Sequence, residues 1–113
     1  MPTFNVIRLS DGVSFPFSEI HKHSSVVVDF WNTSCVRCPA ALAELNARAS
    51  SKAKHVACAL SVGAEQDYAT FLKVRELSDE FPNLDHYFLP FEEKEAAKAE
   101  LGFSQLPYQV QLG

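Results

Sequence analysis

The chain has 113 residues, a length typical of one domain of roughly 100 to 200 residues. With 47% hydrophobic and 21% charged residues and a formal net charge of -4, it has the apolar side chains for a compact core, which excludes disordered and fibrous classes. The ten Lys and Arg residues form no basic run, so we expect no nucleic-acid partner.

The apolar stretches of the chain are short. None approaches the roughly 18 to 20 residues that a membrane-spanning helix needs. Residues 1–12 have neither the basic start nor the apolar core of a secretion signal. We therefore expect a cytoplasmic protein that does not contact a membrane.

The order of apolar and polar residues predicts alternating strands and helices in one domain over residues 1–113. In chain order, we expect a short edge strand at 3–8, a turn at 10–12, a short helix at 17–22, a central strand at 25–31, a helix at 38–49, a strand at 55–62, a helix at 68–81, an extended piece at 83–91, a helix at 92–101 and a last strand at 108–112. Strands that alternate with helices predict parallel pairing with right-handed crossovers, so the fold class is α/β.

Local signals mark the ends of two of these helices. Asn32, Thr33 and Ser34 are N-cap candidates for the helix at 38–49, because their short polar side chains can accept backbone hydrogen bonds. Gly102 follows the helix at 92–101, and glycine there is typical of a left-handed C-cap. Both signals support the predicted helices.

Cys35 and Cys38 are spaced C-x-x-C where the central strand gives way to a helix. A cysteine at the first turn of a helix lies near the positive end of the helix dipole, which favours the thiolate. Cys38 lies one turn further on, close enough to attack a mixed disulfide on Cys35. The spacing therefore predicts a redox pair with Cys35 as nucleophile and Cys38 as resolving thiol.

Two alternatives for this pair stay open. His21 and His23 form an H-x-H that would complete a four-ligand zinc site with Cys35 and Cys38, although no second C-x-x-C is present. The two thiols would be inert in the other alternative. We interpret the third cysteine, Cys58, as a buried small hydrophobe, with a regulatory thiol as its alternative.

Two separate segments resemble the thioredoxin superfamily. The run VVVDFWNTSCVRC at 26–38 is similar to the family's sequence of apolar strand, Asp, aromatic, Trp and C-x-x-C, and the run LGFSQLPYQVQL at 101–112 is similar to its segment with a cis-proline. The long segment at 64–100 looks like the TlpA-like, tryparedoxin and nucleoredoxin branches. The resemblance implies a thioredoxin-like fold, with a central mixed sheet and flanking helices, from which the usual C-terminal strand and helix are absent. The expected alternatives for residues 1–113 are a single thioredoxin-like domain that ends there and one that is truncated at its C-terminus.

The resemblance assigns catalytic roles to three residues. Cys35 would be the attacking thiolate, and Cys38 the resolving thiol. Asp29 would be the semi-buried carboxylate that helps to deprotonate Cys38 through water, a task that suits a carboxyl whose pKa is raised by burial. The alternative for Asp29 is a carboxylate that binds only the neighbouring backbone.

The resemblance also assigns substrate binding to five residues. Trp31 would cover the edge of the site, with simple core packing as its alternative. Val36 and Arg37 stand where the family usually has Gly-Pro or Pro-Pro, and Arg37 would favour the thiolate of Cys35. Pro107 would hold a cis peptide bond, and Leu106 would offer its backbone to an extended substrate strand.

The implied activity is that of a thiol-disulfide oxidoreductase, a protein-disulfide reductase acting in electron transport with no cofactor besides the Cys35–Cys38 disulfide. Its partners would be protein disulfide substrates and an upstream reductase. Because strand 108–112 would form a free sheet edge, we also expect self-association through it. The alternative function is a non-catalytic binding module of the same fold, or an assembly subunit.

Overall fold

The computed structural model describes residues 4–22, 25–49 and 54–112, which form a six-stranded sheet and three α-helices. The strands are β1 (Asn5–Arg8), β2 (Ser14–Pro16), β3 (Val26–Trp31), β4 (Lys54–Leu60), β5 (Asp85–Leu89) and β6 (Tyr108–Leu112), and the helices are α1 (Cys38–Arg48), α2 (Asp67–Leu77) and α3 (Phe91–Leu101). The strand order across the sheet is β2-β1-β5-β4-β3-β6. Parallel pairs join β3 to β4 and β4 to β5, whereas β6, β1 and β2 pair antiparallel, so the predicted mixed α/β sheet is confirmed.

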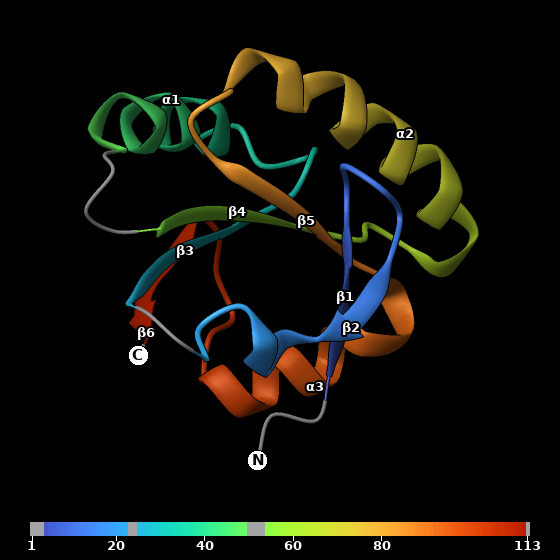
Figure 1. The fold of residues 1–113 in the computed structure, drawn as a ribbon. Helices are drawn as coiled ribbons and strands as arrows, with labels where there is room; N and C mark the ends of the chain where they lie inside the picture. The colour runs from blue at the N-terminus through green and yellow to red at the C-terminus, as the bar shows by residue number, and fades with distance from the viewer. Residues whose placement is uncertain (1–3, 23–24, 50–53, 113) are drawn as a thin grey trace.

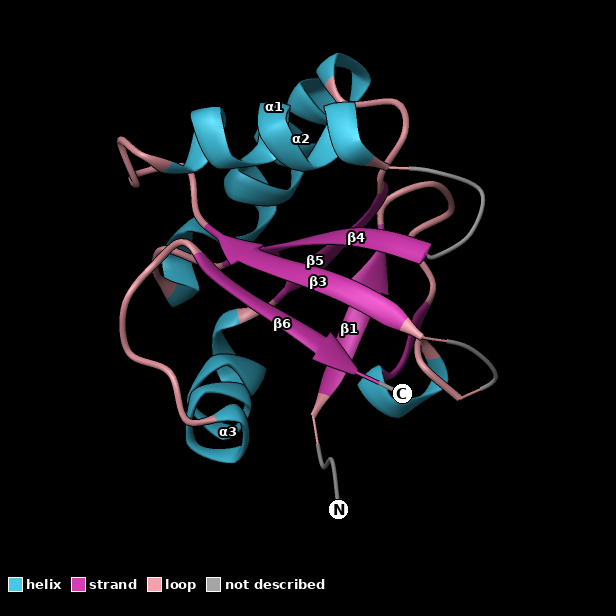
Figure 2. Ribbon diagram, turned by 90° about the vertical axis from the view of Figure 1, so that its left-hand side faces the viewer, coloured by secondary structure: helices cyan, strands magenta, loops and turns pink. Residues whose placement is uncertain are grey.

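Helices cover both faces of the sheet. Figure 1 shows α1 and α2 on one face, with α3 and the short 3-10 helix η1 (Phe17–Glu19) on the other. The view in Figure 2 shows the same three layers from the side, with β3, β4 and β6 side by side. This arrangement produces two separate hydrophobic clusters, one on each face.

Strand β3 supplies side chains to both clusters. Val28 and Phe30 belong to the cluster on the α3 side, while Trp31 belongs to the cluster that contains Cys38 and Leu42 of α1. Side chains alternate between the two faces of a strand, and both faces here are covered, which explains the continuous apolar run in the sequence. The same alternation places Asp29 on the α1 face.

Two predictions about strand positions were wrong. The strand at 25–31 is not central, because β3 lies second from one edge of the sheet, and β1 is not an edge strand. The edge beside β1 is β2, which the sequence analysis missed. Gly12 adopts a φ of +73°, and its turn returns the chain so that Phe15 pairs with Val6. Pro16, the last residue of β2, has no backbone N–H to donate to a further strand, and a strand that contains proline is tolerated at an edge.

The ends of the elements depart modestly from the predictions. No side chain caps α1, whose N-cap residue is Arg37, so the expected caps were wrong. Asn32 instead accepts a hydrogen bond from the Ser34 backbone N–H at 2.9 Å. The helix at 17–22 is only the turn η1, and the helix at 68–81 ends as a short 3-10 segment at Ser78–Glu80. The left-handed cap at Gly102 is confirmed by its φ of +72°. Over the residues described, no helix has the length and apolar character needed to cross a membrane.

Candidate active site

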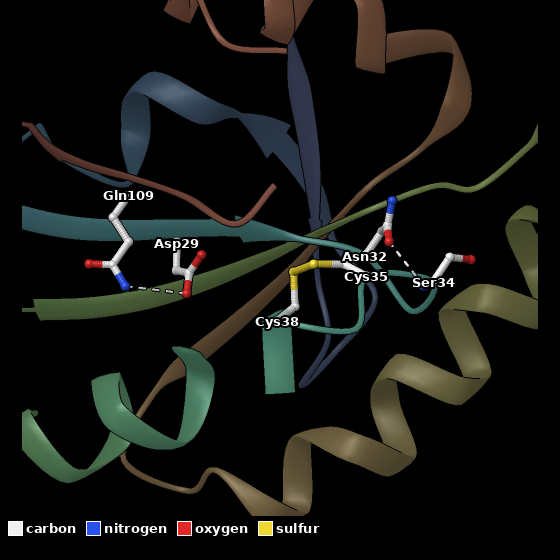
Figure 3. Close-up of a disulfide and its surroundings, with 6 residues drawn as sticks. All are labelled: Asp29, Asn32, Ser34, Cys35, Cys38 and Gln109. Atoms are coloured by element: carbon white, nitrogen blue, oxygen red, sulfur yellow. Dashed lines mark hydrogen bonds between the residues drawn. A yellow bond between two sulfur atoms is a disulfide. The ribbon is translucent and has the colours of Figure 1, made fainter. Parts of the chain in front are cut away.

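Cys35 and Cys38 form a disulfide at the start of α1, with their Cα atoms 5.4 Å apart. The chain leaves β3 at Trp31 and turns into the helix through two backbone hydrogen bonds, Cys35 N–H to Asn32 O and Cys38 N–H to Cys35 O, each 3.3 Å long. Cys38 is fully buried and Cys35 is half-buried (Figure 3). A partner molecule can therefore reach Cys35 and not Cys38.

A groove of about 410 Å³ opens beside Cys35. It lies where parallel strands β3 and β4 end and antiparallel β6 begins, so the segment after β3, the end of β4 and the segment before β6 meet there. Helix α3 supplies the far wall. The lining residues are Asn32, Ser34, Cys35, Val36, Arg37, Leu60, Lys94, Lys98, Phe103, Ser104 and Leu106. The predicted residues Val36, Arg37 and Leu106 thus share one groove with the accessible cysteine.

Asp29 is fully buried on the α1 face of the sheet. Its Oδ2 accepts a hydrogen bond of 3.5 Å from Gln109 Nε2, and its Oδ1 has no partner among the described residues. Figure 3 shows this pair beside the disulfide. Burial raises the pKa of Asp29 to about 7, and the bond from Gln109 opposes part of that rise. A pKa of this size suits Asp29 to proton transfer near neutral pH, and its side chain is fully buried where a semi-buried one was expected.

Trp31 lies in the core rather than along the groove. Only 3% of its surface is exposed, and it packs in the cluster that contains Cys38 and Leu42. Its indole Nε1 has no hydrogen-bond partner in the described part of the chain. This placement matches the core-packing alternative and makes Trp31 a neighbour of the buried cysteine.

The two residues between the cysteines and the two before β6 take different positions. Val36 is 93% exposed and Arg37 is also exposed, so both project from the turn. Leu106 and Pro107 are half-buried, and the peptide bond between them is cis. Their roles in substrate binding stay predictions.

The sequence analysis missed several residues of the site. Gln109 reaches Asp29 only because β6 pairs antiparallel with β3 in a register that places the two residues opposite each other. Lys94 and Lys98 reach the groove from α3, about 60 residues after the cysteines. Their i, i+4 spacing shows that they share a helix face, but only the tertiary fold shows what that face meets.

The zinc alternative finds no support in the described residues. They contain no group of three or more His, Cys, Asp or Glu side chains that could hold a metal ion. His21 packs against the ring of Phe17, and His23 lies outside the described residues.

Cys58 is a buried free thiol on the opposite face of the sheet from the disulfide, in the cluster with Phe30. Burial raises the pKa of this thiol, which makes it unreactive. Its burial and its packing favour the interpretation as a small hydrophobe.

No protein-family model and no curated protein matches this sequence. Solved structures do match it. The thioredoxin domain of a thiol-disulfide oxidoreductase from Bacteroides vulgatus superposes with a TM-score of 0.70 and 16% identity over 98% of this chain and 79% of that one. The exposed lipoprotein thioredoxin of Streptococcus pneumoniae superposes with a TM-score of 0.67 and 17% identity over 97% of this chain and 80% of that one. The N-terminal domain of PilB from Neisseria gonorrhoeae superposes with a TM-score of 0.68 and 18% identity over 96% of this chain and 71% of that one. The chain therefore has the fold of the thioredoxin superfamily, as its two motifs implied.

Proposed function

We propose that this protein is a thiol-disulfide oxidoreductase that reduces or exchanges protein disulfides. The observation that carries the proposal is the asymmetric disulfide at the start of α1, with Cys35 facing a groove and Cys38 buried behind it. The similar structures include a thioredoxin and a domain of a thiol-disulfide oxidoreductase, which supports the same activity.

The first step joins the reduced protein to its substrate. The Cys35 thiolate attacks one sulfur of the substrate disulfide, a new Cys35–sulfur bond forms, and the substrate S–S bond breaks. The second substrate sulfur leaves as a thiolate and takes a proton from solvent. The position of Cys35 just before α1 favours its thiolate, because the first turn of a helix presents unpaired N–H groups and a partial positive charge.

The second step releases the substrate. Asp29 accepts the proton of the Cys38 thiol, through water, and the Cys38 thiolate attacks the sulfur of Cys35. The Cys35–Cys38 disulfide forms, and the other substrate sulfur leaves as a thiolate that also becomes protonated. Two electrons and two protons thus pass from the cysteine pair to the substrate. A pKa of about 7 suits Asp29 to this transfer at neutral pH.

After each turnover, a second protein must return electrons to the oxidised Cys35–Cys38 pair. We propose an upstream reductase that reduces the Cys35–Cys38 disulfide at the same groove. We also propose that the reaction takes place in the cytoplasm, a reducing compartment in which a free thiol such as that of Cys58 persists. A redox potential near about -250 mV would support a reductant, and one near about -150 mV an oxidant or isomerase.

Strand β6 supports a further proposal, that two copies associate through the edge at 108–112. In the described part of the chain, β6 pairs only with β3, so its other side presents unpaired backbone groups. We expect the apparent mass in sedimentation to rise with protein concentration. A single monomeric species at every concentration would contradict this.

Substitutions of the three cysteines test the proposed activity. In the assay, a chemical dithiol supplies electrons and this protein passes them to a protein disulfide. Cys35→Ser should abolish this turnover, because the nucleophile is lost. Cys38→Ser should instead accumulate a mixed disulfide on Cys35, visible by mass spectrometry, since the resolving thiol is gone. Cys58→Ala is the matched control, and its turnover should equal that of the parent. Undiminished turnover in Cys35→Ser would refute the proposal and favour a binding module.

A further inference from the structure

The groove beside Cys35 differs in charge from the rest of the molecule. The sequence carries a formal net charge of -4, yet Arg37, Lys94 and Lys98 all line the groove and no Asp or Glu does. The larger cavity, at the other end of the sheet, contains Asp79 and Asp85 beside its basic residues. The positive charge therefore concentrates around the accessible cysteine.

The two lysines are held against the groove by the fold. Lys94 donates a hydrogen bond of 3.0 Å from Nζ to the backbone oxygen of Ser61, just after β4, which leaves two of its three N–H donors for another acceptor. Lys98 follows one turn later on α3, and its side chain is 31% exposed. The buried Ala97 packs α3 into the core, so the helix holds the backbone of both lysines beside the groove.

Neighbouring carboxylates neutralise these cations only weakly. Glu95 approaches Lys98 at 3.9 Å, but its side chain is 81% exposed, and such an ion pair is loose in water. Arg37 forms no salt bridge with any Asp or Glu in the described part of the chain. A ligand with carboxylates would meet three positive side chains next to the reacting sulfur.

We propose that the groove selects disulfide substrates whose cysteine is flanked by Asp or Glu side chains, with Lys94 and Lys98 as specificity-determining residues. This inference rests on the proposed function, and it adds the chemistry of the substrate. Attraction between the groove and an acidic segment acts before and during the attack by Cys35, so it raises kcat/KM. Because the charges are partly exposed, salt weakens the effect.

The test uses three synthetic peptides that contain one disulfide each and differ only in flanking residues, which are Glu, Gln or Lys. Flanking charge also changes the reactivity of a disulfide toward any thiolate, so each kcat/KM is divided by the rate constant for reduction of the same peptide by dithiothreitol, whose thiolate has no cation beside it. We expect the Glu peptide to exceed the Lys peptide by roughly three- to tenfold at low salt, and this ratio to approach one in about 0.5 M salt.

Neutral variants assign the preference to the groove. The double variant Lys94→Gln/Lys98→Gln should lose most of the preference for the Glu peptide. Lys73→Gln, on the exposed face of α2 and outside the groove, is the matched control and should retain it. Equal normalised rates for the three peptides in the parent protein would overturn the proposal while leaving the oxidoreductase activity in place.

A second measurement does not depend on turnover. In the reduced Cys38→Ser variant, Cys35 is the accessible thiol, and it can be alkylated by anionic iodoacetate or neutral iodoacetamide. The rate constant for iodoacetate divided by that for iodoacetamide should fall about two- to fivefold when both lysines become Gln, and should not change with Lys73→Gln. If no peptide is reduced but this ratio falls, the proposed function is wrong and the anion preference stands. An unchanged ratio contradicts the anion preference.

Discussion

Replacing Asp29 with Asn tests the electrostatics of the site most fully. The substitution keeps the size and shape of the side chain but removes a group that titrates with a pKa of about 7, against 3.8 for an unperturbed aspartate. Because the pKa is raised in the folded state, the folded protein binds a proton that the unfolded chain releases. The associated stability is complete below about pH 4 and is lost as pH rises through about 7.

The size of this effect follows from the pKa difference. One pKa unit corresponds to about 1.4 kcal/mol, so a difference of about three units gives roughly 4 kcal/mol as an upper value. Relaxation around a charged Asp29 and entry of water reduce it, and we expect about 2 to 4 kcal/mol. Asp29→Asn should therefore gain this amount of unfolding free energy, relative to the parent, between pH 4 and pH 8.

Urea unfolding of the oxidised protein, at several pH values and constant ionic strength, measures this difference directly. The disulfide keeps both cysteines from titrating, so the change between parent and variant reports Asp29 alone. Glu65→Gln makes the same change from a carboxylate to an amide at an exposed position and should give no pH-dependent difference. If parent and Asp29→Asn differ by a constant amount from pH 4 to pH 8, the proposed proton acceptor does not exist as described.

Three further predictions concern Gly102, His86 and the second step of the reaction. Gly102→Ala should lower the unfolding free energy by about 1 kcal/mol, because a left-handed φ of +72° disfavours a side chain although nothing lies within 4 Å of the added Cβ; equal urea midpoints would contradict this. Burial lowers the pKa of His86, so the unfolding free energy of His86→Gln relative to the parent should rise as pH falls below about 6.5; a difference that does not change with pH would refute that cause. In Asp29→Asn, the mixed disulfide on Cys35 should persist longer at pH 7 than in the parent, as measured by acid quench and mass spectrometry, and equal lifetimes would remove Asp29 from the second step.

Much of the fold was accessible from local sequence signals. The β-branched run of β3 and the strand at 108–112 depend on residues within the element itself, and their predicted positions match the structure closely. Gly102 likewise marks the end of α3 through its own backbone conformation. The order of the strands could not be predicted in this way. Strands β3 and β5 both pair with β4, and the sequence of a strand does not specify which strand lies beside it in the sheet.

The residues of the site also differ in whether local sequence predicts them. Cys35 and Cys38 lie three residues apart, so their spacing alone predicts that they can form a disulfide. Gln109 and Lys94 act on the site from elements far along the chain, and their contributions depend on sheet register and on the packing of α3. For Trp31, the resemblance to a family predicted a position at the edge of the site. The structure instead places Trp31 in the core, because α1 covers the face of β3 from which its side chain projects.

An equilibrium redox titration of the Cys35–Cys38 pair tests the central claim most directly. Trp31, the single tryptophan, packs in the cluster that contains Cys38, so its fluorescence should follow the state of the disulfide. In defined mixtures of oxidised and reduced dithiothreitol, we predict one reversible transition that fits transfer of two electrons. Absence of a reversible transition, with Cys35 slow to alkylate after reduction, would contradict the account and leave a thioredoxin fold that binds without catalysis.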